Sequence, residues 1–521
     1  MKTVTIYDTT LRDGSQGEGI AYSIQDKIRI AQKLDDFGIP YIEGGWPSNP
    51  KDAQFFARMS RIRMKKGVLA AFGSTRRAGI PAAKDRNLQE LLASKARVVT
   101  IFGKTSLVHV KEVLKTTPQE NLKMIEDSVR FLAENGVEVF YDAEHFFDGY
   151  SHDPSYALQT LLAAQHAGAR YIILCDTNGG ALPGDVMRLI RLIKPKLKNP
   201  VGIHCHNDAG LGIANSIAAV EAGAEMVQGT VNGYGERCGN ADLIPIIANL
   251  KIKMRVDCVS DESLKRLTEL SYFVSEVSNM RHMPNQPYTG DSAFAHKGGV
   301  HINAVMKKTS SYEHIDPERV GNRRRILVSE LGGKSGIMTM ARSMDLDLSK
   351  NDPKTQKAHE LLQKMETKGY HFEAAEASFE LVLKKALSSV SEYFKLESFR
   401  VVVNKDRNKK VSTEAIIKIR INGQLEHTAA DGDGPVNALD SALRKALSHY
   451  YPQLEKMQLS DFKVRVLDEK AGTASRVRVL IQSQDEHDTW STMGVSENII
   501  EASWQALIDS FEYKLMKDKI R

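Results

Sequence analysis

Apolar and polar positions recur along the first 250 residues in a repeating unit. Each unit has a short β-rich run, a polar end, an amphipathic helical stretch and a glycine before the next run. The expected helices end at Phe37-Gly38, Asn135-Gly136, Ala167-Gly168 and Ala222-Gly223. The eight expected strands are Val4–Tyr7, Tyr41–Glu43, Gly67–Phe72, Val98–Phe102, Glu138–Tyr141, Tyr171–Cys175, Gly202–Cys205 and Met226–Thr230. Eight consecutive βα units predict an α/β fold of the (β/α)8 type, a TIM barrel.

The rival fold is a doubly wound open sheet. Such a sheet normally stops at about five to seven strands and carries a glycine-rich phosphate turn after the first. Here that turn reads Asp8-Thr9-Thr10-Leu11-Arg12-Asp13-Gly14-Ser15-Gln16, which is polar and charged. The barrel is therefore favoured, and its active site is expected just past the carboxyl ends of the strands.

The pattern changes twice after the barrel. Residues 257–390 are helical and irregular, which is typical of a linker subdomain, although their first helix is expected to close the barrel. From about 391 two similar halves follow, each with strands and then a helix, so we expect an α+β module with internal pseudo-symmetry. In the first half the strands are Phe399–Val403 and Thr413–Ile421, and a turn at Asp431–Pro435 leads into a helix over Val436–Ser448. In the second half the strands lie near Phe462–Val466 and Arg476–Ile481, with a helix from Glu497. The expected domains are thus the barrel at residues 1–275, the linker subdomain at 276–390 and the α+β module at 391–521.

Composition narrows the class of protein. Of 521 residues, 42% are apolar and 26% are charged, which is the balance of a globular chain with a large core. The sequence has no run of eighteen apolar residues and no apolar segment at its start, so neither membrane insertion nor export is expected. Four cysteines without a CxxC pair argue against a disulfide framework and favour the cytoplasm. A net charge of +6, from 71 basic and 65 acidic residues, makes nucleic acid an unexpected partner.

A metal site is indicated at the end of the seventh strand. Strand alternation places His204 and His206 on one face, where a divalent ion could bind both imidazoles. Asp13 follows the neighbouring first strand and is the natural third ligand, although it could instead cap a helix. Asn240, in the polar glycine-rich loop after the eighth strand, could add a neutral oxygen, unless that loop is only a tight turn. Such a set leaves positions open for a bidentate substrate.

Other polar residues also follow strand ends. Arg12 cannot shed its proton and would stabilise a developing oxyanion, or it could form a salt bridge to Glu43 or Asp8, and both could hold. Glu144 follows the fifth strand as a candidate general base or as an ion-pair partner, and Thr177 follows the sixth. Wall residues are expected at Trp46 and Phe102, and Cys238 is read as structural rather than as a ligand or nucleophile.

Three ordered motifs make the chain resemble a known family. That family comprises metal-dependent acyl-transferring barrels and includes the 2-isopropylmalate, homocitrate and citramalate synthases. The motifs are Asp8-Thr9-Thr10-Leu11-Arg12-Asp13-Gly14, His204-Cys205-His206-Asn207-Asp208 and Gly233-Tyr234-Gly235-Glu236-Arg237-Cys238-Gly239-Asn240-Ala241-Asp242, with Gly299-Val300-His301 as a further match. Within the family, residues 141–150 and 175–180 look most like the longer-form citramalate synthases. The carboxyl-terminal module is similar to the family's amino-acid-binding regulatory domain.

The resemblance implies an activity. A divalent metal, Mn, Mg, Zn or Co, would be held by Asp13, His204 and His206 with Asn240 nearby, and pyruvate would bind to it. Acetyl-CoA would lose a methyl proton, with Glu144 and His301 in that transfer, and thioester hydrolysis would give (R)-citramalate and CoA. The substrate pocket would also include the residues Arg12, Thr177, Asn303 and Tyr312.

The resemblance also implies regulation and assembly. Isoleucine would be the feedback inhibitor in a pyruvate route to isoleucine, bound near residues 432–435 and 493–496, which precede helices whose amides can take a carboxylate. A homodimer is expected if His301 comes from the partner subunit. The alternatives are a 2-isopropylmalate or homocitrate synthase, which use other keto acids, and a metal-dependent aldolase or lyase on the same barrel. A non-enzymatic binding protein would have little reason to concentrate such residues at strand ends.

Overall fold

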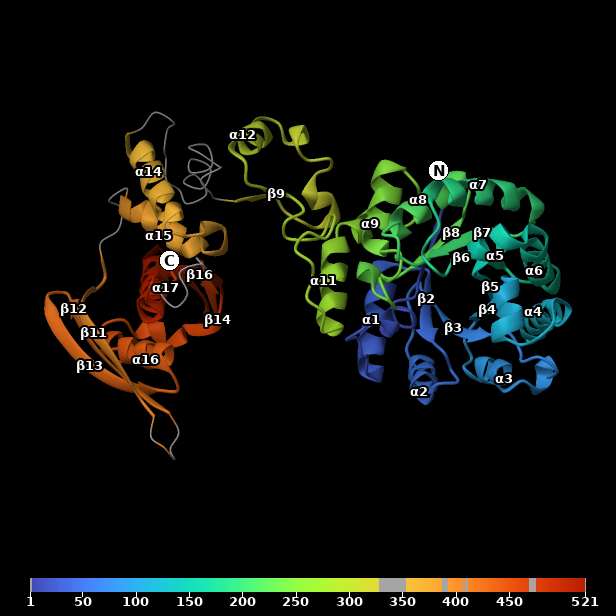
Figure 1. The fold of residues 1–521 in the computed structure, drawn as a ribbon, viewed down its shortest axis with the longest axis horizontal. Helices are drawn as coiled ribbons and strands as arrows, with labels where there is room; N and C mark the ends of the chain where they lie inside the picture. The colour runs from blue at the N-terminus through green and yellow to red at the C-terminus, as the bar shows by residue number, and fades with distance from the viewer. Residues whose placement is uncertain are drawn as a thin grey trace. The chain divides into compact units, whose positions relative to one another are not determined.

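Eight parallel strands close into a barrel in chain order, with helices around them (Figure 1). The computed structural model describes residues 2–327, 353–386, 392–405, 407, 411–467 and 475–520. The barrel strands are β1 (Thr5–Asp8), β2 (Tyr41–Gly45), β3 (Val68–Ser74), β4 (Val98–Lys104), β5 (Glu138–Glu144), β6 (Tyr171–Asp176), β7 (Val201–Cys205) and β8 (Met226–Gly229). The ring closes where β1 pairs in parallel with β8, Thr5 opposite Met226. The predicted (β/α)8 barrel is confirmed.

The barrel has an inner and an outer apolar layer. The inner layer fills the ring with large side chains, including Tyr7, Phe140 and Met226, none of which is exposed. The outer layer lies between the strands and the helices, where Leu34 and Ile190 are fully buried. Because strand side chains alternate between these two layers, most strand positions are apolar and buried.

The helices of this unit begin and end at the signals that the sequence carries. Ser23 and Asp26 form a capping box at the start of α1, and Gly38 ends it in the left-handed region with φ of 96°. The helices are α1 (Ile24–Phe37), α2 (Pro50–Met59), α3 (Arg86–Ala93), α4 (Pro118–Glu134), α5 (Phe146–His152), α6 (Pro154–Ala167), α7 (Pro183–Ile193), α8 (Gly212–Ala222), α9 (Leu243–Ala248), α10 (Asp261–Leu264) and α11 (Leu267–Val277).

Contacts divide the chain into two compact units. The barrel unit comprises Met1–Phe294 with Ile315–Arg324, and the second unit comprises Ala295–His314 with Arg325–Arg521. The finer division at residues 275 and 390 stays a prediction, and parts of that expected linker, 328–352 and 387–390, lie outside the described residues.

The second unit contains two similar halves, as the sequence predicts. In each half a three-stranded antiparallel sheet is followed by a helix, in the orders β11-β12-β13-α16 and β14-β15-β16-α17. The elements are β9 (Ala295–His296), α12 (Gly299–Lys307), β10 (Arg325–Ile326), α14 (Pro353–Thr367), α15 (Glu376–Ala386), β11 (Lys395–Asn404), β12 (Ser412–Ile421), β13 (Gln424–Gly432), α16 (Pro435–Leu447), β14 (Gln458–Val466), β15 (Val477–Gln484), β16 (Thr489–Ser496) and α17 (Ile499–Ile520).

Each half has one strand more than the sequence predicts. The additional strands, which the sequence does not predict, are β13 and β16. Residues 431 and 432, which the sequence places in a turn, form the end of β13. Strand β13 lies at a sheet edge and is only half-buried along its length, so it lacks the apolar alternation that marks a strand.

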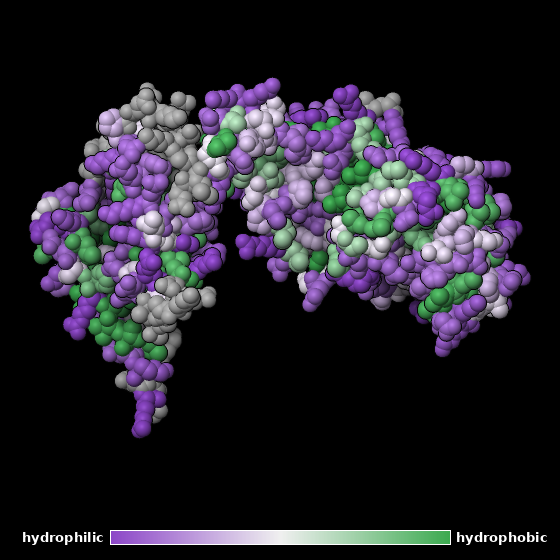
Figure 2. All heavy atoms as spheres, turned by 45° about the horizontal axis from the view of Figure 1, so that its top comes forward, coloured by the Kyte–Doolittle hydropathy of each residue, from purple (hydrophilic) through white to green (hydrophobic). Residues whose placement is uncertain are grey.

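The visible surface of each unit is mostly hydrophilic, with separate apolar patches (Figure 2). This mixture agrees with the nearly balanced charge of the sequence. Among the helices that the structure describes, none has both the length and the apolar character needed to cross a membrane.

Candidate active site and metal centre

A pocket of about 240 Å³ opens at the carboxyl ends of the barrel strands, where the sequence predicts the active site. We call it the mouth pocket. Its lining residues are Arg12, Asp13, Gln16, Trp46, Phe72, Phe102, Asp142, Glu144, Cys175, Thr177, His204, His206, Glu236 and Arg237. All eight strands, or the loops that follow them, contribute to this one pocket because they all run in the same direction.

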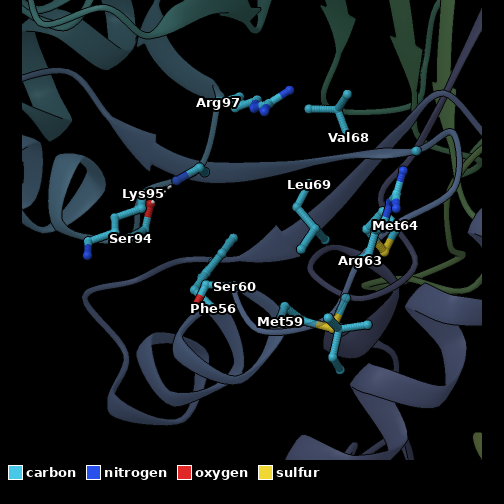
Figure 3. A pocket seen from close by; sticks show the side chains of 13 residues that line it. Phe56, Met59, Ser60, Arg63, Met64, Val68, Leu69, Ser94, Lys95 and Arg97 are labelled. Carbon is cyan, nitrogen blue, oxygen red and sulfur yellow. Dashed lines mark hydrogen bonds between the residues drawn. The ribbon is translucent and has the colours of Figure 1, made fainter.

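A second hollow, of about 440 Å³, lies at the opposite ends of β3 and β4 (Figure 3). Arg63, Lys95 and Arg97 border it above an apolar floor that includes Met59 and Leu69. The described residues that line it include no carboxylate and no imidazole, so this hollow lacks the ligand types that the predicted metal site requires. The mouth pocket is therefore the candidate active site.

The predicted metal ligands Asp13, His204 and His206 meet in the mouth pocket. Asp13 Oδ2 lies 3.5 Å from His204 Nε2 and 4.0 Å from His206 Nε2. All three side chains are buried, and their potential ligand atoms lie within 4.8 Å of one another. Nitrogen and carboxylate oxygen donors at this spacing suit a divalent transition metal ion.

Asn240 lies beside the three ligands because its loop is hydrogen-bonded along the end of β7. Asn207 N donates to Gly239 O over 2.9 Å, and Ala241 N donates to Cys205 O over 2.8 Å. The Asn240 Oδ1 atom is buried and has no hydrogen-bond partner among the described residues. An orphaned amide oxygen beside a ligand cluster fits a metal ligand, because buried polar atoms are normally paired. Position 235 requires glycine, because the Cβ of any other residue would lie 2.1 Å from Asn240 Nδ2 and displace the Asn240 side chain.

The charge states of these groups also suit a metal. Burial lowers the pKa of His204 to about 3, so its imidazole is neutral and can donate a lone pair. Burial alone would raise the pKa of Asp13, but Arg12 and the two histidines outweigh it and hold that pKa at about 2. The cluster thus offers one carboxylate and neutral imidazoles at physiological pH.

Arg12 is held in place by the buried carboxylate of Glu43. Its Nε donates to Glu43 Oε2 over 2.6 Å, its Nη1 donates to Asp13 Oδ2 over 3.0 Å, and its guanidinium lies 3.7 Å from the centre of the Phe72 ring. Glu43 is fully buried and also accepts hydrogen bonds from Tyr7 and Thr9. Of the two partners considered from the sequence, Glu43 is therefore the one that Arg12 contacts. Asp8 instead accepts hydrogen bonds from Thr10.

Glu144 and Thr177 lie on adjacent strand ends in the same pocket. Glu144 forms an ion pair with Lys104, which the sequence analysis did not identify. Strand register explains the pair, because Lys104 and Glu144 are direct partners in the β4–β5 ladder. Glu144 thus forms an ion pair and also lines the pocket in which the sequence predicts a general base.

The wall of the mouth pocket is aromatic, as expected. The Trp46 ring meets Phe72 and Phe102 edge to face, with ring centres 5.9 Å apart in both pairs. Asp142 lines the same pocket and accepts a hydrogen bond from Gln228 Nε2 over 3.1 Å. Burial, with Glu43 nearby, raises the pKa of Asp142 to about 8, so this side chain is a neutral acid at pH 7.

Two further groups at the mouth were not singled out from the sequence. Arg237 donates to both carboxylate oxygens of Asp208, over 2.7 and 3.0 Å, and to Thr177 O over 2.8 Å. His145, next to Glu144, donates its backbone N–H to Thr177 Oγ1 over 2.9 Å. Cys238 is an exposed free thiol.

His301, Asn303 and Tyr312 belong to the second unit, so they are not part of the cluster within the barrel. His301 and Asn303 are exposed on α12, and the His301 ring lies 4.1 Å from the Tyr312 ring. The structure thus brings two of these three residues together. Their contribution to the mouth pocket stays a prediction.

Comparison with known proteins identifies the family. The HMGL-like family matches residues 3–274, the homocitrate synthase post-HMGL domain-like family matches 288–369, and the LeuA allosteric (dimerisation) domain matches 373–515.

Full-length relatives agree with these matches. The (R)-citramalate synthase of Geobacter sulfurreducens is 51% identical, covering 100% of this chain and 99% of the relative. That of Aquifex aeolicus is also 51% identical and covers 99% of this chain and 98% of the relative. A 2-isopropylmalate synthase of Methanocaldococcus jannaschii is 29% identical over 99% of this chain and 95% of its own length. The chain therefore belongs to the (R)-citramalate synthase family, whose barrel is of the HMGL-like type.

Proposed function

We propose that this enzyme condenses acetyl-CoA with pyruvate and water to give (R)-citramalate and CoA, and that it requires a divalent metal ion. The observation that carries the proposal is the convergence of Asp13, His204 and His206 beside Arg12 in the mouth pocket. The curated relatives at 51% identity over the full chain support the choice of substrates.

Asp13, His204 and His206 would hold the ion, with Asn240 Oδ1 as a further oxygen ligand. When bound, a divalent ion supplies Lewis-acid polarisation of the keto group. Neutral imidazoles and an orphaned amide oxygen fit manganese, cobalt or zinc, and magnesium through the oxygens.

The chain's own residues supply the remaining chemistry. Arg12 would stabilise the ketone oxygen as it becomes negative, and the buried Glu43 holds its guanidinium in place. The hydroxyl of Thr177 would bind the carboxylate of pyruvate. Glu144 would take part in removing the methyl proton of acetyl-CoA, whose carbon then attacks the ketone carbon. Hydrolysis of the thioester would release CoA and drive the reaction forward.

His301 would complete the proton transfer, with Asn303 and Tyr312 at the acyl-CoA side of the site. The close contact of the His301 and Tyr312 rings, whose centres lie 4.1 Å apart, supports their acting together. The match to a LeuA dimerisation domain supports a homodimer, in which one subunit would supply His301 to the other.

Pyruvate is favoured over 2-oxoglutarate by the charges that line the pocket. The mouth pocket has a volume of about 240 Å³, and Trp46, Phe72 and Phe102 form its aromatic wall. Arg12 is assigned to the ketone oxygen and Arg237 is paired with Asp208, so the described lining has no further arginine for the distal carboxylate of 2-oxoglutarate. The lower identity to 2-isopropylmalate synthases points the same way.

The test is CoA release from acetyl-CoA with pyruvate, 2-oxoisovalerate and 2-oxoglutarate in turn, with and without a chelator. We expect release with pyruvate only, lost on chelation and restored by a divalent metal. Stronger release with either other acid would overturn the substrate assignment. Release that survives complete chelation would overturn the metal requirement.

We also propose feedback inhibition by isoleucine, bound where the amino ends of α16 and α17 follow the strands β13 and β16. The LeuA allosteric domain match supports regulation by a small molecule at this unit. An isoleucine titration should lower activity and raise the melting temperature. If both stay constant while leucine or another amino acid changes them, isoleucine is not the effector.

A further inference from the structure

His145 has a strained backbone at the edge of the mouth pocket. It directly follows Glu144 and adopts φ of 58° and ψ of 34°, in the left-handed region. Residues other than glycine adopt this conformation rarely, at a cost of order 1–3 kcal/mol, and only when surrounding contacts hold them there. Contacts around His145 must therefore stabilise this conformation.

Two contacts hold the imidazole. Its ring stacks on His109, with ring centres 3.8 Å apart and planes 17° from parallel. Its Nδ1 lies 3.6 Å from Asp148 Oδ2, one helical turn further along α5. Asp148 is itself held by Asn178, whose Nδ2 donates to Oδ2 over 2.7 Å. The side chain is thus tied to the loop after β4 and to the loop after β6.

The backbone on both sides of His145 is also fixed. Glu144 O accepts hydrogen bonds from Thr105 N over 3.1 Å and from Thr105 Oγ1 over 2.6 Å. A Cβ at Gly149 would lie 2.5 Å from Thr105 O, so α5 packs closely against the same loop. The peptide between Glu144 and His145 consequently has little freedom to rotate.

The result is a defined direction for the Thr177 hydroxyl. His145 N donates to Thr177 Oγ1 over 2.9 Å, while Arg237 Nη2 donates to Thr177 O over 2.8 Å. A hydroxyl that accepts a hydrogen bond from an N–H still has its own proton to donate, and that proton must point away from the N–H. Thr177 lines the mouth pocket, so the proton is available to a carboxylate bound there.

We propose that His145 is a positioning residue, whose backbone N–H orients the Thr177 hydroxyl toward the carboxylate of the keto acid. The inference rests on the proposed function, because it needs a keto acid in the mouth pocket. A substrate binds more tightly when the polar group that contacts it is already oriented, because ordering that group then costs no free energy on binding. The stack on His109 maintains the strained conformation and does not touch the substrate.

A double-mutant cycle tests the proposal, with His145→Ala, Thr177→Val and the two combined. His145→Ala removes the stack and disfavours the left-handed conformation, so we expect the KM for pyruvate to rise about 10-fold or more while the KM for acetyl-CoA changes less than about twofold. Thr177→Val should raise the KM for pyruvate similarly. The double variant should match Thr177→Val alone, because His145 acts only through that hydroxyl.

Two further variants separate positioning from folding. His145→Asn retains a residue that tolerates the left-handed region, so it should recover the KM for pyruvate to within about threefold of the wild type. His166→Ala removes an exposed imidazole from α6, the next helix along the chain, and should leave both KM values unchanged. If His145→Ala does not fold, His109→Ala removes the stack instead, and its effect should likewise vanish in the Thr177→Val background.

Contrary outcomes are distinct. An unchanged KM for pyruvate in His145→Ala, or effects that multiply in the double variant, would overturn the positioning role and leave the proposed function intact. A wild-type enzyme without pyruvate-dependent CoA release would overturn both.

Discussion

Replacing Glu43 by glutamine should disable Arg12, although every proposed metal ligand keeps its own side chain. Glu43 is fully buried, and its Oε2 accepts from Arg12 Nε over 2.6 Å. Glutamine keeps the size of the side chain but removes the negative charge that fixes the guanidinium. Arg12 would then be free to turn toward its remaining carboxylate partner, Asp13, 3.0 Å away.

The size of the effect follows from the contact that is lost. A buried hydrogen bond between charged groups contributes about 1.5 to 3 kcal/mol. If this free energy is lost from the transition state, kcat/KM falls about 10- to 150-fold, because each 1.4 kcal/mol is a factor of ten. The same loss from the folded state lowers the melting temperature by about 2 to 5 °C in a unit of about 300 residues.

The assay is thiol detection of CoA released from acetyl-CoA and pyruvate, together with thermal unfolding. Glu126→Gln is the matched control, because Glu126 pairs with Arg130 on the exposed surface of α4 and such pairs contribute only about 0.3 to 0.5 kcal/mol. We expect Glu126→Gln to behave as the wild type. A Glu43→Gln variant with activity within twofold of the wild type would refute the view that Glu43 orients Arg12 for catalysis.

Three other perturbations follow from the structure. Gly235→Ala should displace Asn240 and weaken the affinity for the metal about 10-fold or more, as measured by calorimetric titration. Gly180→Ala is the control, because its added Cβ meets nothing within 4 Å, and it should bind the metal normally. Equal affinities of the two variants would remove Asn240 from the ligand set. Asp13→Ala should bind no metal at a stoichiometric concentration and show less than about 1% of wild-type CoA release, and full activity would exclude Asp13 as a ligand. Burial raises the pKa of Asp509 from 3.8 to about 7, so the folded state holds an extra proton between these values and stability falls as the pH rises through this window. The melting temperature of Asp509→Asn relative to the wild type should therefore increase between pH 5 and pH 8, and a constant difference would contradict this origin.

The barrel could be predicted from the sequence because each of its strands is buried on both sides. Such strands contain continuous apolar runs, for example residues 171–175, and a glycine such as Gly38 marks the end of the helix that precedes the next strand. Strands β13 and β16 could not be found this way, since their sequences mix polar and apolar residues without clear alternation. Their place depends on pairing with β12 and β15, which is a tertiary property.

Site residues at strand ends could be collected from the sequence because parallel strands end at one face. His204, His206 and Asp13 met as expected. Lys104 was missed because its importance depends on the register between β4 and β5, which pairs it with Glu144. His145 was missed because a left-handed backbone at a histidine leaves no mark in the sequence.

The most direct measurement follows the methyl carbon of acetyl-CoA. With acetyl-CoA labelled with carbon-13 at the methyl group, pyruvate and a divalent metal, we expect nuclear magnetic resonance to show the label in a methylene carbon of citramalate. The amount should equal the CoA released, and chelation should abolish both. Label recovered only as acetate, with CoA release independent of pyruvate, would mean that the protein hydrolyses the thioester without forming a carbon–carbon bond.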